Sequence, residues 1–429
     1  MQELGLRTKI LDAYTKLDLN ELLLFLRLRL LSTTGSHHDL AIRLVEYDLT
    51  KYNDIGRSQV PPPSIPQPPP TPPLTDDTPN ILSNLPIDLL TEILDHLGSW
   101  ELSKAVGVPT SLPCPSEWST KATSLDYAIL SGSLNQVRQA SSAPFTKLGA
   151  NILVAFDMVS ILNYLWGIRT LRPVFQSCFG NDLNLLPGIA SANNRPRILE
   201  WWYNQEDINP KHYSTDSIDV ACRNLSLAAL EWWDHKSRAC MADPALEHLP
   251  FPPYYTQKAM EAASSKAHLA VLTFFVTHGW PLQPGRSLDN ASSTGHISVL
   301  NWWAYESGLE LGKDVKYDKN AVYLASCSGK VEVLQWWKEQ SEKSKAGGGT
   351  GVQMLFDGDS LVGATRYNRP EVLDWWDKSG LPVNYRICDI EEALEDATGG
   401  GREVRKWWAR KGVNFKAGDS EWMKVRPLN

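Results

Sequence analysis

Tryptophan occurs in this chain mostly as adjacent pairs, and the pairs recur at a nearly regular spacing. Twelve of the 17 tryptophans in the 429 residues form six such pairs, and a phenylalanine pair fills the gap between the second and the third. Successive pairs start about 34 residues apart, which is the period of two-helix solenoid repeats. The spacing therefore predicts an array of helical repeats. The pairs are Trp201-Trp202, Trp232-Trp233, Phe274-Phe275, Trp302-Trp303, Trp336-Trp337, Trp375-Trp376 and Trp407-Trp408.

The residues around each pair predict two helices per repeat. Two apolar residues and one polar residue precede the pair, as in Val299-Leu300-Asn301, which indicates a helix with a broad buried stripe and one solvated position. An alanine lies eleven residues before the first aromatic in six units, and a turn-like residue such as Gly295 or Gly329 often follows it by four. We therefore expect a first helix that ends near the alanine, a tight turn, and a second helix that carries the pair. The six alanines are Ala190, Ala221, Ala263, Ala291, Ala325 and Ala364.

Weaker copies of the same pattern extend the array in both directions. The segments around Ala128 and Ile161 have the features of two degenerate leading copies. Ala397 lies ten residues before Trp407 and marks a closing copy. In total we expect about nine units in residues 120–429.

Both aromatic residues of a pair are predicted to belong to the core. Adjacent residues on a helix point about 100° apart, so one aromatic can be buried within its own repeat and the other against the next. Aromatic burial supplies much of the stability of such an array. The alternative is that the second aromatics form an exposed stripe that binds a partner.

The repeat pattern resembles the ankyrin repeat. Residues 291–303 read Ala-Ser-Ser-Thr-Gly-His-Ile-Ser-Val-Leu-Asn-Trp-Trp, with aromatics where ankyrin repeats usually carry leucines, and residues 379–384 resemble the turn after the second ankyrin helix. The Thr-Pro-Leu-His opening of the family is missing in every unit, so an irregular first-helix cap is expected. The style resembles divergent, Trp-rich ankyrin-like arrays of fungal proteins. The resemblance implies that the repeat surface binds an unidentified protein.

Proline divides the chain into a small head and everything that follows. Ten of the 28 prolines lie between Pro61 and Pro79. Proline fixes φ and removes a backbone donor, so residues 57–79 are predicted to be an extended, disordered linker. The linker separates a head, residues 1–56, from a helical segment in residues 80–119 and the repeats in 120–429.

The segment that follows the linker predicts an amphipathic helix. Residues 85–97 read Leu-Pro-Ile-Asp-Leu-Leu-Thr-Glu-Ile-Leu-Asp-His-Leu. The proline and the acids near the start suit a helix amino terminus. The apolar residues recur with helical spacing and make one face. On periodicity alone, this is a generic amphipathic helix that could also cap the first repeat of the solenoid.

The same segment resembles the opening of an F-box. Trp100 to Gly107 suits a second helix, residues 108–115 interrupt the third, and Trp118 follows. The resemblance implies that the helix binds a Skp-type adaptor and, through it, a cullin–RING ubiquitin ligase, in a helix-in-groove mode. The adaptor-binding residues would be Leu85, Pro86, Leu89, Leu90, Ile93, Leu94 and Leu97.

The head resembles a SAP domain, a helix–turn–helix motif of chromatin and RNA-processing proteins. Residues 17–47 predict two helices on either side of a turn at Gly35. The resemblance implies weak, salt-sensitive DNA binding, since histidines occupy positions of the turn and the head has a net charge of −1. A helical hairpin that docks on protein is the alternative. The DNA-binding residues would be Arg27, Arg29, Gly35, Ser36, His37, His38 and Arg43.

Composition and motifs limit the remaining classes of function. The net charge is −7, the sequence has no GxGxxG, GxxxxGK[ST], HExxH or GxSxG motif, and its six cysteines have no metal-ligand spacing. We therefore expect a mainly α-helical, non-enzymatic protein without a cofactor or metal site. It is expected to lie inside the cell, in the nucleus, the cytoplasm or both, away from membranes. Its function is predicted to be that of a substrate receptor of a ubiquitin ligase, and the alternative is an interaction scaffold.

Overall fold

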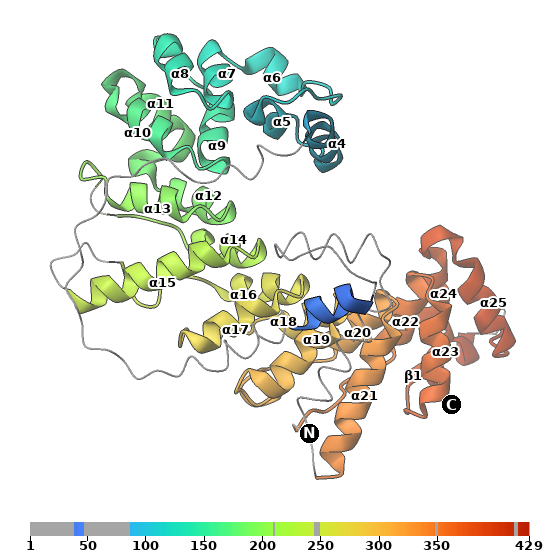
Figure 1. Ribbon diagram of the computed structural model, residues 1–429. Coiled ribbons are helices and arrows are strands. Elements are labelled where there is room, and N and C mark those ends of the chain that lie inside the picture. Colours follow the sequence, from blue (N-terminus) through green and yellow to red (C-terminus); the bar gives the residue numbers. More distant parts are fainter. Residues whose placement is uncertain are drawn as a thin grey trace. The chain divides into compact units, whose positions relative to one another are not determined.

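The structure is a computed structural model, and it is mainly α-helical, which confirms the predicted fold class (Figure 1). The chain divides into two units, Met1–Ile81 and Leu82–Asn429. The strands of the described part are β1 (Asn384–Tyr385) and β2 (Arg426–Pro427), which pair antiparallel. The structure describes residues 38–46, 86–208, 211–243, 249–347, 351–415 and 419–428.

Nine helix pairs follow one another in the described part of the second unit. The first helices pack on one another in chain order from α12 to α24, and each second helix packs beside them. The 3-10 helix η2 (Arg169–Leu171), α11 (Arg172–Phe179) and η3 (Asn181–Leu183) are inserted after the second pair. The pairs are α7 (Ser124–Leu130) with α8 (Leu134–Ala140), α9 (Lys147–Ala155) with α10 (Val159–Gly167), α12 (Leu186–Ala192) with α13 (Pro196–Tyr203), α14 (Asp216–Arg223) with α15 (Leu227–Ala242), α16 (Gln257–Ser265) with α17 (Leu269–Thr277), α18 (Ser287–Thr294) with α19 (Ile297–Asn301) and its π-helical continuation η4 (Trp302–Glu306), α20 (Asn320–Cys327) with α21 (Val331–Lys345), α22 (Asp359–Arg366) with α23 (Pro370–Ser379), and α24 (Ile387–Glu395) with α25 (Arg402–Arg410).

The alanine of each repeat lies near the end of the first helix, where neighbouring first helices pack on each other. All six alanines are completely buried. The closing copy differs from the prediction, because α24 ends at Glu395 and Ala397 lies in the connection beyond it. Ala393, also completely buried, occupies the corresponding place two residues before the helix end. The glycines at 399–401, all at positive φ, lengthen this turn and shift the spacing.

The turn between the two helices of a repeat requires a residue in the left-handed region. The residue four positions after the alanine has a φ between 53° and 91° in all six units. Glycine adopts this conformation without strain, whereas a side chain at Cβ makes it unfavourable. Only two of the six positions carry glycine. The six residues are Asn194, Leu225, Ala267, Gly295, Gly329 and Asn368.

The second aromatic of every pair is completely buried. In five of the seven pairs it is a tryptophan whose indole N–H reaches back to the preceding repeat and donates to the hydroxyl of the residue that directly follows the alanine. The side-chain distances are 2.9 Å for Trp233 to Ser191, 3.1 Å for Trp303 to Ser264, 3.1 Å for Trp337 to Ser292, 3.3 Å for Trp376 to Ser326 and 2.9 Å for Trp408 to Thr365. The aromatics were expected to pack within their own repeat and against the next one, and these bonds instead run to the repeat before.

One step of the array lacks both partners of this hydrogen bond. The residue after Ala221 is Cys222, and the aromatic of the next repeat is Phe275, which has no N–H group; both side chains are completely buried. Trp202 shows the opposite case, because its indole N–H is buried without a partner in the structure. For the repeats that begin with α14 and later helices, the hydroxyl after the alanine and the indole of the following repeat are therefore either both present or both missing.

The first aromatic of a pair makes a second ladder. It is buried at five of the seven positions and half-buried at Trp232 and Trp375. In five of the seven pairs its N–H donates to a polar side chain on the preceding second helix. In four of these five the acceptor is the polar residue just before that helix's own pair, so at these steps that position is a hydrogen-bond acceptor and not merely solvated. The distances are 3.4 Å for Trp201 to Asn163, 2.7 Å for Trp232 to Glu200, 2.7 Å for Trp336 to Asn301, 3.1 Å for Trp375 to Gln335 and 2.5 Å for Trp407 to Asp374.

In five repeats an aromatic residue in the segment before the first helix packs on the second aromatic of the same repeat. The ring centroids lie 4.5–5.1 Å apart, a normal distance for tilted or edge-to-face pairs. The loops thereby cover the edge of the core. The pairs are Tyr213 with Trp233, Tyr255 with Phe275, Tyr317 with Trp337, Phe356 with Trp376 and Tyr385 with Trp408.

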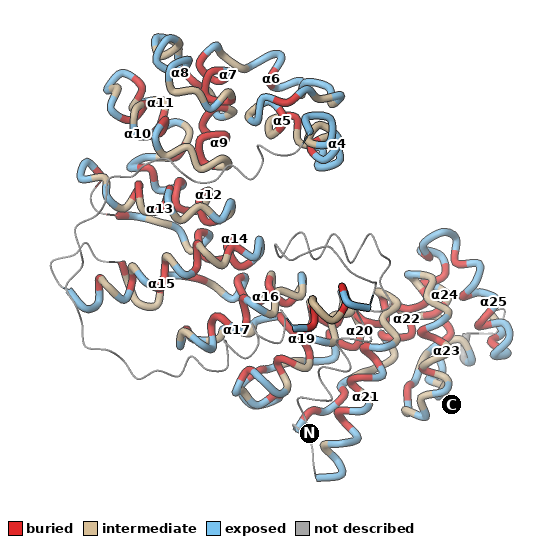
Figure 2. The backbone as a smooth tube through the Cα atoms, in the orientation of Figure 1, coloured by how far each residue is buried: buried red, intermediate tan, exposed pale blue. Residues whose placement is uncertain are grey.

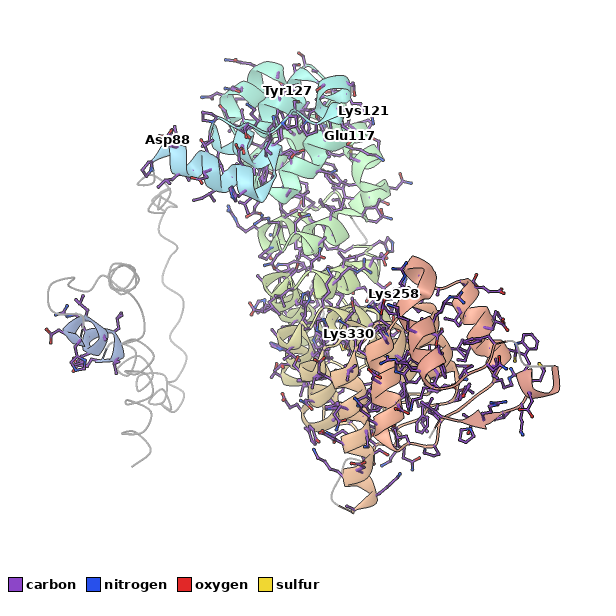
Figure 3. All side chains as sticks on the ribbon, turned by 90° about the vertical axis from the view of Figure 1, so that its right-hand side faces the viewer. Asp88, Glu117, Lys121, Tyr127, Lys258 and Lys330 are labelled. Atoms are coloured by element: carbon purple, nitrogen blue, oxygen red, sulfur yellow. The ribbon has the colours of Figure 1, made fainter. Side chains whose placement is uncertain are left out.

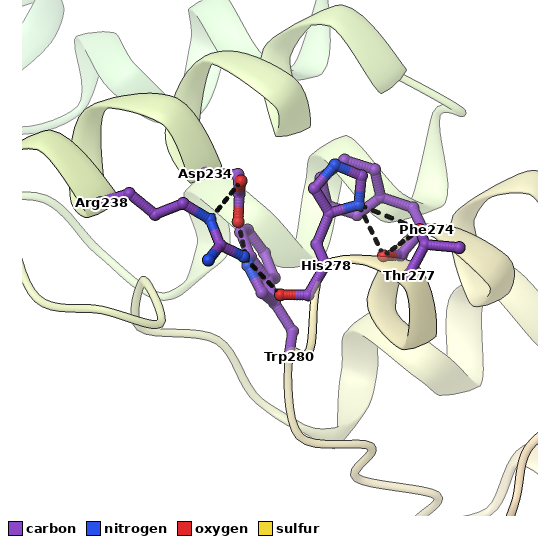
Figure 4. A network of polar contacts seen from close by, with 6 residues as sticks. All are labelled: Asp234, Arg238, Phe274, Thr277, His278 and Trp280. Atoms are coloured by element: carbon purple, nitrogen blue, oxygen red, sulfur yellow. Dashed lines mark hydrogen bonds and ion pairs between the residues drawn. The ribbon is translucent and has the colours of Figure 1, made fainter. Parts of the chain in front are cut away.

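Asp234 adds a polar connection between α15 and the loop after α17 (Figure 4). Its carboxylate accepts the indole N–H of Trp280 at 2.7 Å and an N–H of Arg238 at 2.7 Å. Arg238 also donates to the main-chain oxygen of His278 at 2.5 Å. A single carboxylate thus fixes the loop of one repeat against the helix of another.

Candidate functional site

Helix α4 (Ile87–Leu97) begins the described part of the second unit. Pro86 precedes it in an extended conformation and Asp88 lies in its first turn, which suits the amino-terminal end of the helix dipole. The helix ends at Leu97 and is capped by Gly98, whose φ of 69° lies in the left-handed region. Asp88 projects from the solvent-facing start of the helix (Figure 3). The predicted helix boundaries are close to those observed.

Only part of the apolar face of α4 is used for packing. Leu94 is 8% exposed and Leu90 is half-buried, and α4 packs on α5 (Trp100–Val106). The expected adaptor-binding set therefore needs a correction, because Leu94 is not accessible to a partner. The reason is that the neighbouring helix α5 takes up the side of α4 on which these two leucines lie.

The other side of the face is open to solvent (Figure 2). Leu89 is 48% exposed, Ile93 is 49% exposed and Leu97 is 64% exposed. Their spacing of four residues places them in one row, which we call the α4 stripe. Ile87 is also exposed, at 58%, and Pro86 is exposed at the helix start. Leu85, the remaining residue of the expected set, lies outside the described residues.

Asp95 holds α4 against residues 108–115, the segment between α5 and α6. Its carboxylate accepts hydrogen bonds from the hydroxyl of Ser111 at 2.6 Å, the hydroxyl of Thr110 at 2.5 Å and the main-chain N–H of Ser111 at 3.0 Å. These bonds, with the Ser111 hydroxyl first, lower the pKa of Asp95 below its usual value. The carboxylate is therefore ionised and fully engaged at neutral pH, on the side of α4 away from the stripe.

Trp118 connects this segment to the first repeat. It lies on α6 (Ser116–Lys121), is 2% exposed, and packs on Trp100 with ring centroids 5.7 Å apart. Its indole N–H donates to Glu101 at 3.0 Å, and its main-chain oxygen accepts the hydroxyl of Tyr127 on α7 at 3.0 Å. Helices α5 and α6 thereby cover the end of the array, while α4 projects its stripe beyond them.

The alternative role of α4 as a cap predicted that Leu89, Ile93 and Leu97 pack against residues 128–140. The structure does not bring them there, since all three are exposed. The helix that packs on α7 is α5. In the described part of the chain, α5 therefore covers the first repeat, and α4 carries the exposed stripe.

The head is described only for a helix over residues 38–46. Leu40, Ala41, Leu44 and Val45 are buried, His38 is exposed and Arg43 is half-buried. This helix coincides with the second of the two predicted helices. The other proposed DNA-binding residues, Arg27, Arg29, Gly35, Ser36 and His37, lie outside the described residues.

Comparisons with known proteins add no family to this description. No protein-family model matches the chain, and no curated protein matches it significantly in sequence. Across the described ranges, no helix is both long and apolar enough to cross a membrane. The same residues contain no group of three or more histidine, cysteine or acidic side chains placed to hold a metal ion.

Proposed function

We propose that this protein is a non-enzymatic substrate receptor of a cullin–RING ubiquitin ligase, in which α4 binds a Skp-type adaptor. The observation that supports the proposal most is the α4 stripe, whose three side chains are all about half exposed or more. Complete burial of one such side chain is worth about 1.5–3 kcal/mol. A row of three on a short helix therefore matches the helix-in-groove mode, in which a few apolar anchors dominate binding.

The packing of the inner side of α4 against its neighbours supports the same proposal. Leu94 and Asp95 fix α4 on its inner side, so the stripe lies on a helix that is already packed against its neighbours. Preorganisation of this kind lowers the entropy that docking must overcome. The repeats, which are attached through α5 and Trp118, would then hold the substrate protein.

The second candidate is an interaction scaffold with no link to ubiquitin. The packing of α5 on α7 favours it, because a solenoid needs its end covered whether or not an adaptor binds. This role leaves the exposed α4 stripe without a function. We therefore rank the receptor first.

The proposal includes weak DNA binding by the head and a location in the nucleus, the cytoplasm or both. His38 is exposed on the described helix of the head, where it could approach a phosphate. A fluorescent DNA duplex titrated with the chain at rising salt tests this part. Binding that does not weaken with salt would contradict a phosphate contact and favour the protein-docking alternative.

Co-purification tests the receptor function directly. The full chain is expressed with a Skp-type adaptor and a cullin, beside the variants Ile93→Asp and Val106→Asp. Val106 is an exposed apolar residue on α5, 44% accessible and outside the stripe, so it is a matched control. We expect the wild type and Val106→Asp to retain both partners and Ile93→Asp to lose them. Absence of capture by the folded wild type would overturn the proposal.

A further inference from the structure

A second exposed apolar surface lies among the second helices of the array, between α19, α21 and α23. It is a shallow groove whose floor is made by Ile297, Val331, Trp336 and Trp375. Ile297, Val331 and Trp375 are half-buried, so parts of their side chains remain accessible. We call this surface the α21 groove. It is far along the chain from α4 and takes no part in the proposed adaptor contact.

Most of the polar side-chain atoms that the α21 groove offers are hydrogen-bond acceptors. The indole N–H of Trp336 is bonded to Asn301 at 2.7 Å, and that of Trp375 is bonded to the Gln335 oxygen at 3.1 Å. The Gln335 amide nitrogen donates to Glu339 at 2.9 Å. What remains for a ligand are the accessible part of the Trp375 indole, the carboxylate oxygens and one N–H of the Gln335 amide. Such a surface favours a ligand that is rich in donors.

The rim of the α21 groove carries negative charge that the protein itself does not neutralise. Glu332 and Glu339 both line the groove and are exposed, and neither has an ion pair among the described residues. The half-buried Lys338 on the same helix pairs with Glu342 at 3.7 Å, one turn further on. Indole faces and carboxylates together attract a cation, the first through the ring quadrupole and the second through charge.

At two other places between neighbouring second helices, a lysine of the protein itself lies over an aromatic ring and pairs with a carboxylate. Lys236, four residues after the first aromatic Trp232, lies over the Tyr203 ring at 4.6 Å and bonds to Glu200 at 2.9 Å. Lys411, four residues after Trp407, lies over that ring at 5.8 Å and pairs with Asp377.

The position that corresponds to these two lysines is occupied differently in the α21 groove. It is four residues after Trp375 and carries Ser379, whose hydroxyl donates to the main-chain oxygen of Trp376 at 2.7 Å. The serine is thus engaged at the end of its own helix and supplies no charge to the groove.

We propose that the α21 groove binds a segment of a partner protein through a basic side chain, above all arginine. The aliphatic stem would lie on the apolar floor beside Trp375, and the guanidinium would meet Glu332 and Glu339. Arginine suits the site better than lysine because its planar group stacks on aromatic rings and bonds to more than one oxygen. The claim that the bound segment belongs to the ligase substrate rests on the proposed receptor function. The claim that the groove binds a basic peptide does not.

The test uses the full chain and a defined peptide, without any adaptor. The probe is a fluorescein-labelled nonapeptide with one arginine flanked by leucines, compared with the same peptide carrying citrulline, which has the same shape without the charge. Fluorescence anisotropy is expected to give a dissociation constant below about 1 mM for the arginine peptide. The citrulline peptide should bind about tenfold more weakly, since hydrogen bonds to charged groups are the stronger kind.

Variants of the chain locate the binding site. Glu332→Gln with Glu339→Gln should weaken binding of the arginine peptide about tenfold. Glu342→Gln is the matched control, because Glu342 lies on the same helix but pairs with Lys338, and it should leave binding unchanged. Equal binding of both peptides, or full retention by the double variant, would overturn the proposal. Since no adaptor is present, failure here leaves the receptor function to its own test.

Discussion

The indole N–H of Trp233 donates to the hydroxyl of Ser191, 42 residues earlier in the chain, at 2.9 Å. The bond joins the second helix of one repeat to the first helix of the repeat before it, and both side chains are completely buried. Because a buried donor without a partner is expensive, the bond fixes which face of α15 meets α12. At the step from Cys222 to Phe275 the hydroxyl and the indole are both missing, whereas the Trp202 N–H is buried without a partner.

Removal of this acceptor should destabilise the array. Ser191→Ala leaves the Trp233 N–H buried without a partner, so we expect the free energy of unfolding to fall by about 1–3 kcal/mol. Urea denaturation followed by tryptophan fluorescence measures the change. Ser237→Ala is the control, because Ser237 is completely buried and its hydroxyl has no partner in the structure. Equal destabilisation by both variants would contradict a role for the hydrogen bond.

Glycine should stabilise the turn at position 267. Ala267 has a φ of 57°, in the left-handed region, where a Cβ atom is unfavourable. Ala267→Gly is therefore expected to raise the free energy of unfolding by about 1 kcal/mol, whereas Ala263→Gly, the same change inside α16, should lower it by a similar amount. Thermal melts of the two variants beside the wild type check the opposite signs. A loss of stability in both would show that the turn is not strained.

Stability near α4 should depend on pH through Asp95. Its folded-state pKa is lowered, so the carboxylate contributes stability that is present above its ordinary, unfolded pKa near 4 and is lost as the pH falls through the lower folded value. The difference in unfolding free energy between the wild type and Asp95→Asn should shrink as the pH is lowered from 6 toward 3. Asp88→Asn, at the solvent-facing start of the same helix, is the control (Figure 3). A difference that stays constant with pH would contradict the assignment.

The repeat architecture could be predicted from the sequence because the aromatic pairs and alanines keep register. Hydrophobic burial dominates folding, and a periodic pattern of large apolar residues states directly which helix faces meet. The Ala-Ser dipeptides were also visible, yet their role depends on a contact between repeats that periodicity does not encode. Ala397 was assigned wrongly because the glycines at 399–401 altered the spacing. Helix α11 could not be predicted, because its segment carries no aromatic pair.

The sequence predicts that the candidate site is an amphipathic helix. It does not predict which of the apolar residues of that helix are exposed. The spacing of Leu89 to Leu97 defines an apolar face, whereas which part of that face is covered depends on the position of α5. Leu94 is therefore part of the core and Ile93 part of the surface, although they are neighbours in sequence. The same limit applies to the polar residue before four of the aromatic pairs. It accepts a hydrogen bond from the next repeat, and that bond depends on how the repeats stack.

Titration of the full chain with a purified Skp-type adaptor, bound to the amino-terminal part of its cullin, tests the central claim most directly. Calorimetry of the wild type, Val106→Asp and Ile93→Asp gives three dissociation constants under identical conditions. We predict that the wild type and Val106→Asp bind equally, and that Ile93→Asp binds at least about 30-fold more weakly, the effect of losing a binding hot spot of about 2 kcal/mol. Binding that is unaffected by Ile93→Asp, or no binding by the folded wild type, would contradict the assignment of α4 as the adaptor-docking helix.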